Sequence, residues 1–330
     1  MSTLFFIFIF IASAIIISFA SLSLTKKCEK LATRFNFSQA LFGMITAIGA
    51  NAPEISSSIS AIYMRYHEIG FGVIIGSNII NLAGLLGISA LITGRIKVNF
   101  SNLVLNGGIG LITTVIISLL IFDITSTWTT FFLMLAFLIP YLYLISQQPA
   151  TIKKMKIPQK VKNFFTLVVK HSHDDVQSED KTKFSLTDFL VSVFCLFIIV
   201  GGSIVLVFSA IELSNYWNIS HAIVGILILA GLTSIPNMIT AIFLAKKGLG
   251  VAVVSETFNS NTLNFLTGIC IPVLLFGMGK VSKEIEFSIL WLLGMILFAL
   301  ISLSFLKGFR RISGAFIIFL YLIYSLVIIF

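Results

Sequence analysis

Charged residues are scarce in this chain of 330 residues: they make up 11% of it, whereas apolar residues make up 58%. A soluble globular domain carries roughly 25% charged residues, so the composition argues against a soluble fold. Cysteine is also rare, with three residues and no paired Cys or His motif, which argues against a disulfide framework and a zinc site. The sequence therefore predicts a chain that folds in a lipid bilayer.

Acidic residues are fewer than basic ones, 13 against 22, which gives a net charge of +9. A basic surface for nucleic acid is not indicated, because the Lys and Arg residues lie in the segments between apolar runs, where they report membrane orientation. The expected partners are the lipid bilayer and small inorganic cations, with no nucleic acid. No cofactor is expected beyond transported cations, and a monomer is compatible with the sequence.

The apolar residues form runs long enough to cross a bilayer as helices, which takes about 20 residues each. The first run lacks the basic start of a signal peptide, so we interpret it as a membrane helix. The runs span residues 3–22, 37–64, 71–92, 102–122, 127–146, 185–211, 219–245, 249–276, 285–306 and 312–330. The prediction is an all-α polytopic membrane protein with ten transmembrane helices.

A long hydrophilic stretch, residues 147–184, contains eight lysines and separates five runs from five. We interpret it as a mobile linker between a first five-helix repeat, residues 1–146, and a second, residues 185–330. The segments after the odd-numbered runs hold 19 of the 22 Lys and Arg residues. Because cytoplasmic loops are rich in these residues, both termini are predicted outside and the linker in the cytoplasm, in a prokaryotic plasma membrane. Five helices per half make the two repeats inverted.

Two polar segments of the first half recur in the second. Residues 47–54, Ala-Ile-Gly-Ala-Asn-Ala-Pro-Glu, match residues 230–237, Ala-Gly-Leu-Thr-Ser-Ile-Pro-Asn. Residues 76–81, Gly-Ser-Asn-Ile-Ile-Asn, match residues 259–264, Asn-Ser-Asn-Thr-Leu-Asn. Both pairs are displaced by 183 residues without a gap. Interrupted hydrophobic segments at matching positions of inverted halves indicate a transport site near the bilayer midplane.

Carboxylates inside the predicted spans are the next signal. Glu54 and Glu256 lie well inside spans, and no Lys or Arg lies inside a span to pair with them. An ionised carboxylate at this depth costs several kcal/mol when unpaired, so we interpret a transported cation as the missing counter-charge. Pro53 and Pro236 each remove a backbone donor and free carbonyl oxygens one turn upstream.

The side chains near these prolines offer mainly oxygen atoms. Such hard ligands suit calcium or sodium and not a soft transition metal. Residues four apart share a helix face, which groups Ser77 with Asn81 and Ser260 with Asn264. The donors expected around Glu54, besides freed carbonyls, are the side chains of Asn51, Ser77, Asn81, Thr233, Ser234, Ser260 and Asn264.

Other interpretations of the polar residues are open. Ser and Asn in membrane helices often serve only as helix contacts, but their duplication together with prolines and a carboxylate favours a binding site. A membrane-embedded enzyme is not expected, because the spans lack a catalytic aspartate pair, a zinc motif and a nucleophile with its base.

In combination, the motifs resemble the α-repeats of the cation/calcium exchanger superfamily, Gly-Thr-Ser-x-Pro-Glu followed by Gly-Ser-Asn-x-x-Asn. They stand at residues 49–54 and 76–81, and at residues 232–237 and 259–264. The resemblance implies an inverted fold in which helices 1 and 6 slide, and antiport of calcium or another cation against sodium or protons. The implied ligands are Glu54, Ser77, Asn81, Thr233, Ser234, Ser260 and Asn264, with Asn51 and the carbonyl of Ala50 at two further motif positions.

Three departures from the family motifs bear on cation binding. Asn237 stands where the second repeat has its glutamate, and Ala50 and Asn51 replace the first-half Thr and Ser. One carboxylate neutralises a divalent ion weakly, which favours a monovalent cargo or a substitute anion. Glu256, one turn before Ser260, is the candidate substitute. Asn237 and Ala50 also favour an alternative, a transport-inactive ion-sensing or scaffold membrane protein of the same fold.

Overall fold

The computed structural model describes residues 3–35, 39–98, 100–147, 149–155, 158–173, 185–305 and 308–330, which are almost entirely helical. The first half contains α1 (Thr3–Arg34), α2 (Gln39–Tyr63), α3 (His67–Asn81), η1 (Leu82–Ile88), α4 (Ser89–Thr93), α5 (Phe100–Ile121) and α6 (Thr127–Ser146). The second half contains α9 (Leu186–Trp217), α10 (His221–Ile223), η2 (Val224–Leu229), α11 (Ala230–Thr233), α12 (Ile235–Lys246), α13 (Gly250–Leu263), η3 (Asn264–Cys270), α14 (Ile271–Phe276), α15 (Lys283–Phe305) and α16 (Arg311–Ile329).

The all-α membrane fold is confirmed. Within the described residues, eight helical segments are long and apolar enough to cross a bilayer, and the π-helical stretches η1 and η3 are continuous parts of two of them. A ninth is a broken span, in which His221–Thr233 and Ile235–Lys246 meet at a bend of 44°. Helix α2, with 25 residues, is long enough to be the tenth but carries more polar residues. The exact count of ten therefore stays a prediction.

The predicted mobile linker contains two helices, α7 (Pro149–Lys154) and α8 (Gln159–His173). Val161, Phe164, Phe165 and Val168 repeat at helical spacing on α8, and this helix packs against α5 and α6. The sequence did not predict these two helices, because the lysine-rich composition hides the apolar face of α8, and the mobility of the linker stays a prediction. Residues 174–184 of the predicted linker lie outside the described residues.

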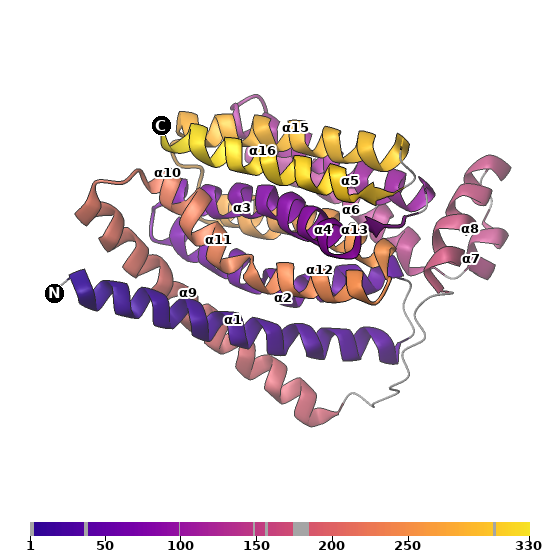
Figure 1. Cartoon of the computed structure of the whole chain (residues 1–330), viewed down its shortest axis with the longest axis horizontal. Helices are drawn as coiled ribbons and strands as arrows, with labels where there is room; N and C mark the ends of the chain where they lie inside the picture. The colour runs from indigo at the N-terminus through magenta and orange to yellow at the C-terminus, as the bar shows by residue number, and fades with distance from the viewer. Residues whose placement is uncertain are drawn as a thin grey trace.

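The two chain ends lie on the same side of the molecule, and α7 and α8 lie at the opposite side (Figure 1). Such an arrangement follows when each half crosses the bundle an odd number of times. A short antiparallel pair of strands, β1 (Arg95–Ile96) and β2 (Phe309–Arg310), joins the two halves where α4 ends and α16 begins.

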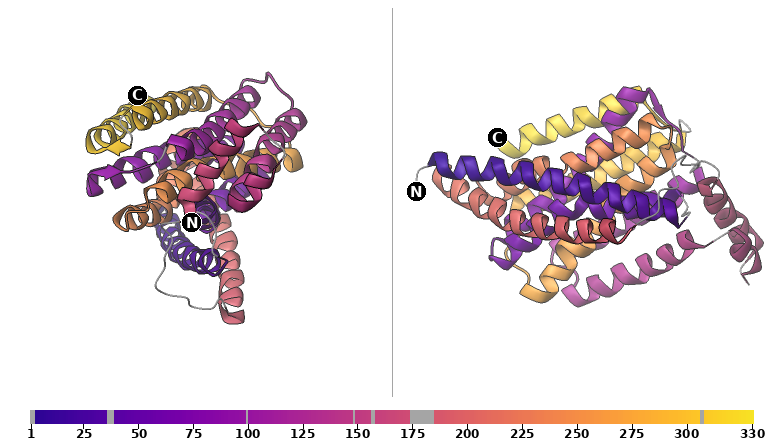
Figure 2. Two further views of the ribbon diagram at one scale, coloured as in Figure 1. Left: turned by 90° about the vertical axis from the view of Figure 1, so that its right-hand side faces the viewer. Right: turned by 90° about the horizontal axis from the view of Figure 1, so that it is seen from below.

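Helices α1 and α9 are the longest, with 32 residues each, and they lie beside each other at one edge of the bundle (Figure 2). Each is about 48 Å long, against a hydrocarbon layer of about 30 Å. Near the linker they are joined by ion pairs, in which Lys27 Nζ lies 2.6 Å from Asp188 Oδ1 and Lys30 Nζ lies 3.0 Å from Asp188 Oδ2. Asp188 also forms a capping box with Ser185 at the start of α9.

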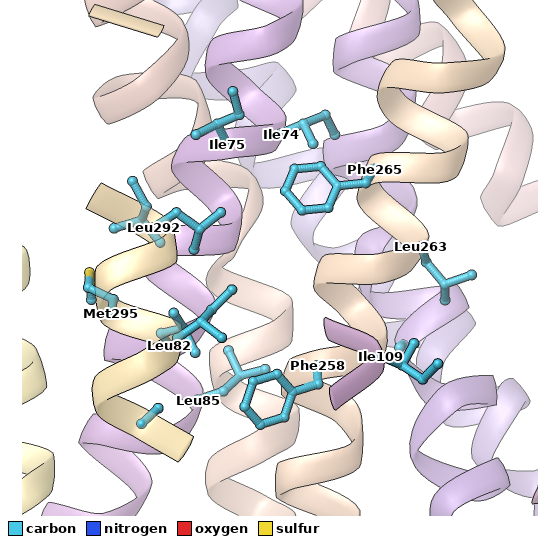
Figure 3. Packing of buried hydrophobic residues seen from close by; sticks show 14 of the residues in the cluster. Ile74, Ile75, Leu82, Leu85, Ile109, Phe258, Leu263, Phe265, Leu292 and Met295 are labelled. Atoms are coloured by element: carbon cyan, nitrogen blue, oxygen red, sulfur yellow. The ribbon is translucent and has the colours of Figure 1, made fainter. Parts of the chain in front are cut away.

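Apolar packing around α3 and α13 holds the polar segments at the centre. Phe265 of η3 points toward Ile74 of α3 (Figure 3). Phe258 of α13 lies about two helical turns before Phe265, on the same side of this continuous span. Gly76 permits direct backbone contact between the halves, because a Cβ there would overlap the carbonyl oxygen of Ile226 in η2. This contact places the neighbouring Ser77 against the second half.

Candidate cation-binding site

Glu54 on α2 is fully buried, and the second half of the chain supplies its hydrogen-bond donors. Its Oε1 accepts from Ser234 Oγ at 2.6 Å and from Asn237 Nδ2 at 3.0 Å. Its Oε2 accepts from Asn264 Nδ2 at 2.7 Å. The carboxylate of one repeat is thus surrounded by the polar motifs of the other.

The contacts around Glu54 follow the internal repeat. Asn237 Nδ2 also donates to Asn51 Oδ1 at 2.7 Å. A displacement of 183 residues relates Asn51 to Ser234 and Glu54 to Asn237. The bond between Asn51 and Asn237 is therefore the twofold counterpart of the bond between Ser234 and Glu54. The duplication predicted this pairing of the two halves.

Four asparagines form a second set of matched contacts. Asn81 Nδ2 donates to Asn261 Oδ1 at 3.1 Å, and its counterpart Asn264 donates to Asn78 Oδ1 at 3.0 Å. Asn78 and Asn261 also donate to each other's backbone carbonyl oxygens, at 3.2 and 3.3 Å. The sequence interpretation gave Asn78 and Asn261 no role, although their presence in both repeats was a signal. They join α3 to α13.

The two prolines act differently on their helices. Pro236 lies directly after the 44° bend, whereas α2 stays helical through Pro53. The carbonyl oxygen of Gly49, four residues before Pro53, accepts from Ser21 Oγ of α1 at 3.0 Å. Because this hydroxyl replaces the missing backbone donor, the predicted interruption does not break α2. The sequence interpretation missed Ser21, which carries no motif.

Two predicted ligands use their polar atoms elsewhere. The carbonyl oxygen of Ala50 lies 3.4 Å from Ser21 Oγ. Thr233 Oγ1 donates to the carbonyl oxygen of Leu229 at 2.8 Å, within its own helical segment. Both residues are buried, and both adjoin residues that contact Glu54 or Asn237.

Several buried oxygen atoms of the predicted ligand set have no hydrogen-bond partner among the described residues. These are Ser77 Oγ, Asn81 Oδ1, Asn237 Oδ1, Ser260 Oγ and Asn264 Oδ1. Buried polar atoms normally find a partner, so a group of unpartnered oxygens indicates a ligand. Neutral oxygens beside one carboxylate suit a hard cation. In the described part of the chain, no three His, Cys, Asp or Glu residues gather in one place.

Glu256 lies apart from this cluster. It is fully buried on α13, and neither carboxyl oxygen has a hydrogen-bond partner among the described residues. Its backbone faces Gly43, where a Cβ would lie 3.1 Å from Glu256 N. Gly43 precedes Glu54 by 11 residues on α2, which is about 16 Å along the helix. The structure therefore does not bring Glu256 to Asn237.

The fold and the site define an integral membrane protein of the transporter class rather than an enzyme. The family model for the sodium/calcium exchanger protein matches residues 5–147 and 187–330. The chain belongs to this family, and the resemblance of its motifs is confirmed.

Individual relatives match at lower coverage. The sodium/potassium/calcium exchanger 1 of Mus musculus is 31% identical over 161 residues, covering 46% of this chain and 14% of that protein. The corresponding protein of Gallus gallus is 32% identical over 161 residues, covering 46% of this chain and 24% of that protein. This chain thus matches less than a quarter of either relative.

A solved structure shares the whole fold. The sodium-calcium exchanger NCX_Mj superposes with a TM-score of 0.64 and covers 98% of both chains at 22% sequence identity. The helices of the two proteins are therefore arranged alike over nearly the full length of both chains.

Proposed function

We propose that this chain is a secondary active antiporter, which exchanges calcium or another cation for sodium or protons by alternating access. The observation that carries the proposal is the fully buried carboxylate of Glu54, whose hydrogen-bond donors come from the opposite repeat. A movement between the two halves would open this site, because Glu54 lies in the first half and its hydrogen-bond donors Ser234, Asn237 and Asn264 lie in the second. The names of the mammalian and avian relatives include sodium, potassium and calcium as exchanged ions.

The charge of the site favours a monovalent cation. Glu54 is the one carboxylate of the cluster in the described residues, since Glu256 does not reach it. A monovalent cation balances this charge, whereas calcium leaves a positive charge in a site of low dielectric constant. We therefore infer that calcium binds less well here than in a site with two carboxylates.

Access to the site involves α1. Ser21 on this helix contacts the carbonyl oxygens of Gly49 and Ala50, one turn before Pro53. A slide of α1 along α2 breaks these bonds and exposes the carbonyl oxygens to the ion path. The ion pairs of Asp188 with Lys27 and Lys30 make α1 and α9 move together. We place both termini outside and residues 147–184 in the cytoplasm, on the distribution of Lys and Arg.

Isotope exchange in proteoliposomes tests the proposed function. Vesicles containing the purified protein are loaded in turn with sodium, calcium or potassium, and uptake of the labelled ion is measured under sodium and pH gradients applied separately. We expect uptake driven by an opposite gradient of sodium or protons. Protein-free vesicles and vesicles with heat-denatured protein are the controls. If no cation moves under any gradient, antiport is ruled out.

The absence of the second carboxylate supports one other candidate, a transport-inactive ion-sensing or scaffold protein of the same fold. Asn237 favours this alternative, because it replaces the second glutamate of the motif and leaves one negative charge, instead of two, to bind a cation. Cation binding to the purified protein without any counterflow would select this alternative.

A further inference from the structure

The protein itself supplies hydrogen-bond donors to both oxygens of Glu54. Its two oxygens receive three bonds, from the Ser234 hydroxyl and from the side-chain amides of Asn237 and Asn264, at 2.6 to 3.0 Å. Bonds of this kind to a charged acceptor are among the stronger ones in proteins and offset much of the cost of burial. The chain therefore carries its own donors for the Glu54 carboxylate, independent of a cation.

Asn237 makes this arrangement possible. It is the twofold counterpart of Glu54, and its Nδ2 lies 3.0 Å from Glu54 Oε1. A carboxylate at this position would place two negative charges at a similar separation, where they repel strongly unless a cation lies between them. A site with two carboxylates thus requires an ion before it closes, whereas a site with an amide does not.

The same amides also suit the ion-bound site. Asn237 and Asn264 turn their Nδ2 atoms to the carboxylate, because a carboxylate accepts and does not donate, and their Oδ1 atoms have no partner among the described residues. Rotation about the Cβ–Cγ bond exchanges the two ends of each amide, and it also breaks the bonds from these Nδ2 atoms to Asn51 Oδ1 and Asn78 Oδ1. A cation at Glu54 then meets two amide oxygens in place of two N–H donors.

We propose that this chain has a further activity, net movement of a cation without a counter-ion, because the ion-free protein closes and reorients through the amide hydrogen bonds of Asn237 and Asn264. Strict exchange requires that the empty protein stays immobile. In this chain the amides of Asn237 and Asn264 stabilise the closed site when no cation is bound, which lowers the free-energy cost of closing it empty. The inference rests on the proposed function and adds that its coupling is incomplete.

Efflux of radioactive sodium from proteoliposomes tests this inference. The vesicles contain a pH-sensitive dye and are loaded with or without the permeant anion thiocyanate, which can leave together with sodium. They are diluted into choline medium without thiocyanate, sodium, potassium or calcium. We expect efflux into this medium that depends on thiocyanate and leaves the internal pH unchanged, because a single positive charge leaves without return. Exchange into sodium medium is measured in parallel.

A substitution of Asn237 locates the cause. In Asn237→Glu we expect the ratio of net efflux to exchange to fall about tenfold or more, the effect of replacing a buried hydrogen bond by repulsion. Glu256→Gln alters a buried carboxyl group that lies apart from the cluster and is the control, for which we expect the ratio to stay near the wild-type value. Thermal unfolding of each variant shows that the protein is folded.

The outcomes separate the inference from the proposed function. Efflux that requires sodium outside, or that acidifies the vesicles at the rate at which sodium leaves, shows strict exchange and overturns the inference while antiport stands. An equal ratio in wild type and Asn237→Glu also overturns it. No sodium movement under any condition overturns the inference, and the wider ion screen then decides the proposed function separately.

Discussion

The substitution Glu54→Gln is expected to abolish transport. It keeps the shape of the side chain but removes the one negative charge in the described part of the cluster, where Ser234, Asn237 and Asn264 converge. Cation affinity should fall on the order of 100-fold, which corresponds to the loss of one partner of a buried charge pair. Isothermal titration with sodium and calcium, together with isotope flux, measures the loss.

Glu256→Gln is the matched comparison for Glu54→Gln, since it makes the same chemical change at the other buried carboxyl group. Because Glu256 has no hydrogen bond to the cluster among the described residues, we expect cation affinity to be retained. An equal loss in both variants would revive Glu256 as the substitute for the missing second glutamate. Wild-type flux in Glu54→Gln would remove Glu54 from the site altogether.

The substitution Asn237→Glu should change which ions bind. It places a second carboxylate beside Glu54, at the position that the repeat relates to it. Two carboxylates balance a divalent cation, so we expect affinity for calcium relative to sodium to rise about tenfold or more. Competition between calcium and labelled sodium for the purified protein measures this ratio. Asn237→Gln, which adds length without charge, should leave the ratio near that of the wild type.

A result in which Asn237→Glu binds calcium no better than the wild type would contradict the charge argument. Selectivity would then arise from the geometry of the neutral oxygens, such as Ser77 Oγ and Ser260 Oγ, and not from the number of carboxylates. Thermal unfolding in the absence of ions separates this outcome from simple misfolding. The variant should be the less stable protein without ions and should gain more from added calcium.

The repeat in the sequence predicted most of what the site contains. Motifs displaced by a constant 183 residues implied that Glu54 and Asn237 occupy equivalent places, and they meet in the structure. Apolar runs predicted the helices well, since membrane spans carry a strong compositional signal. Helix α8 was harder to predict from the sequence, because lysines and other polar residues separate its apolar positions.

Other features depended on tertiary contacts that no local pattern reveals. Pro53 predicted a break in α2, but Ser21 of another helix supplies the missing donor. Glu256 was assigned to the site by its spacing from Ser260, whereas its backbone packs against Gly43, about 16 Å along α2 from Glu54. The π-helical turns η1 and η3, which begin at Leu82 and Asn264, also lie beside the site and gave no sequence signal.

We infer that two inverted halves enclose one cation at Glu54. The most direct measurement is the anomalous diffraction of crystals grown with thallium, a monovalent cation, in place of sodium. We expect a peak in contact with the Glu54 carboxylate and with the side-chain oxygens of Asn237 and Asn264, whose amides have then rotated. A peak at Glu256 alone, or none in the protein at concentrations that support transport, would contradict it.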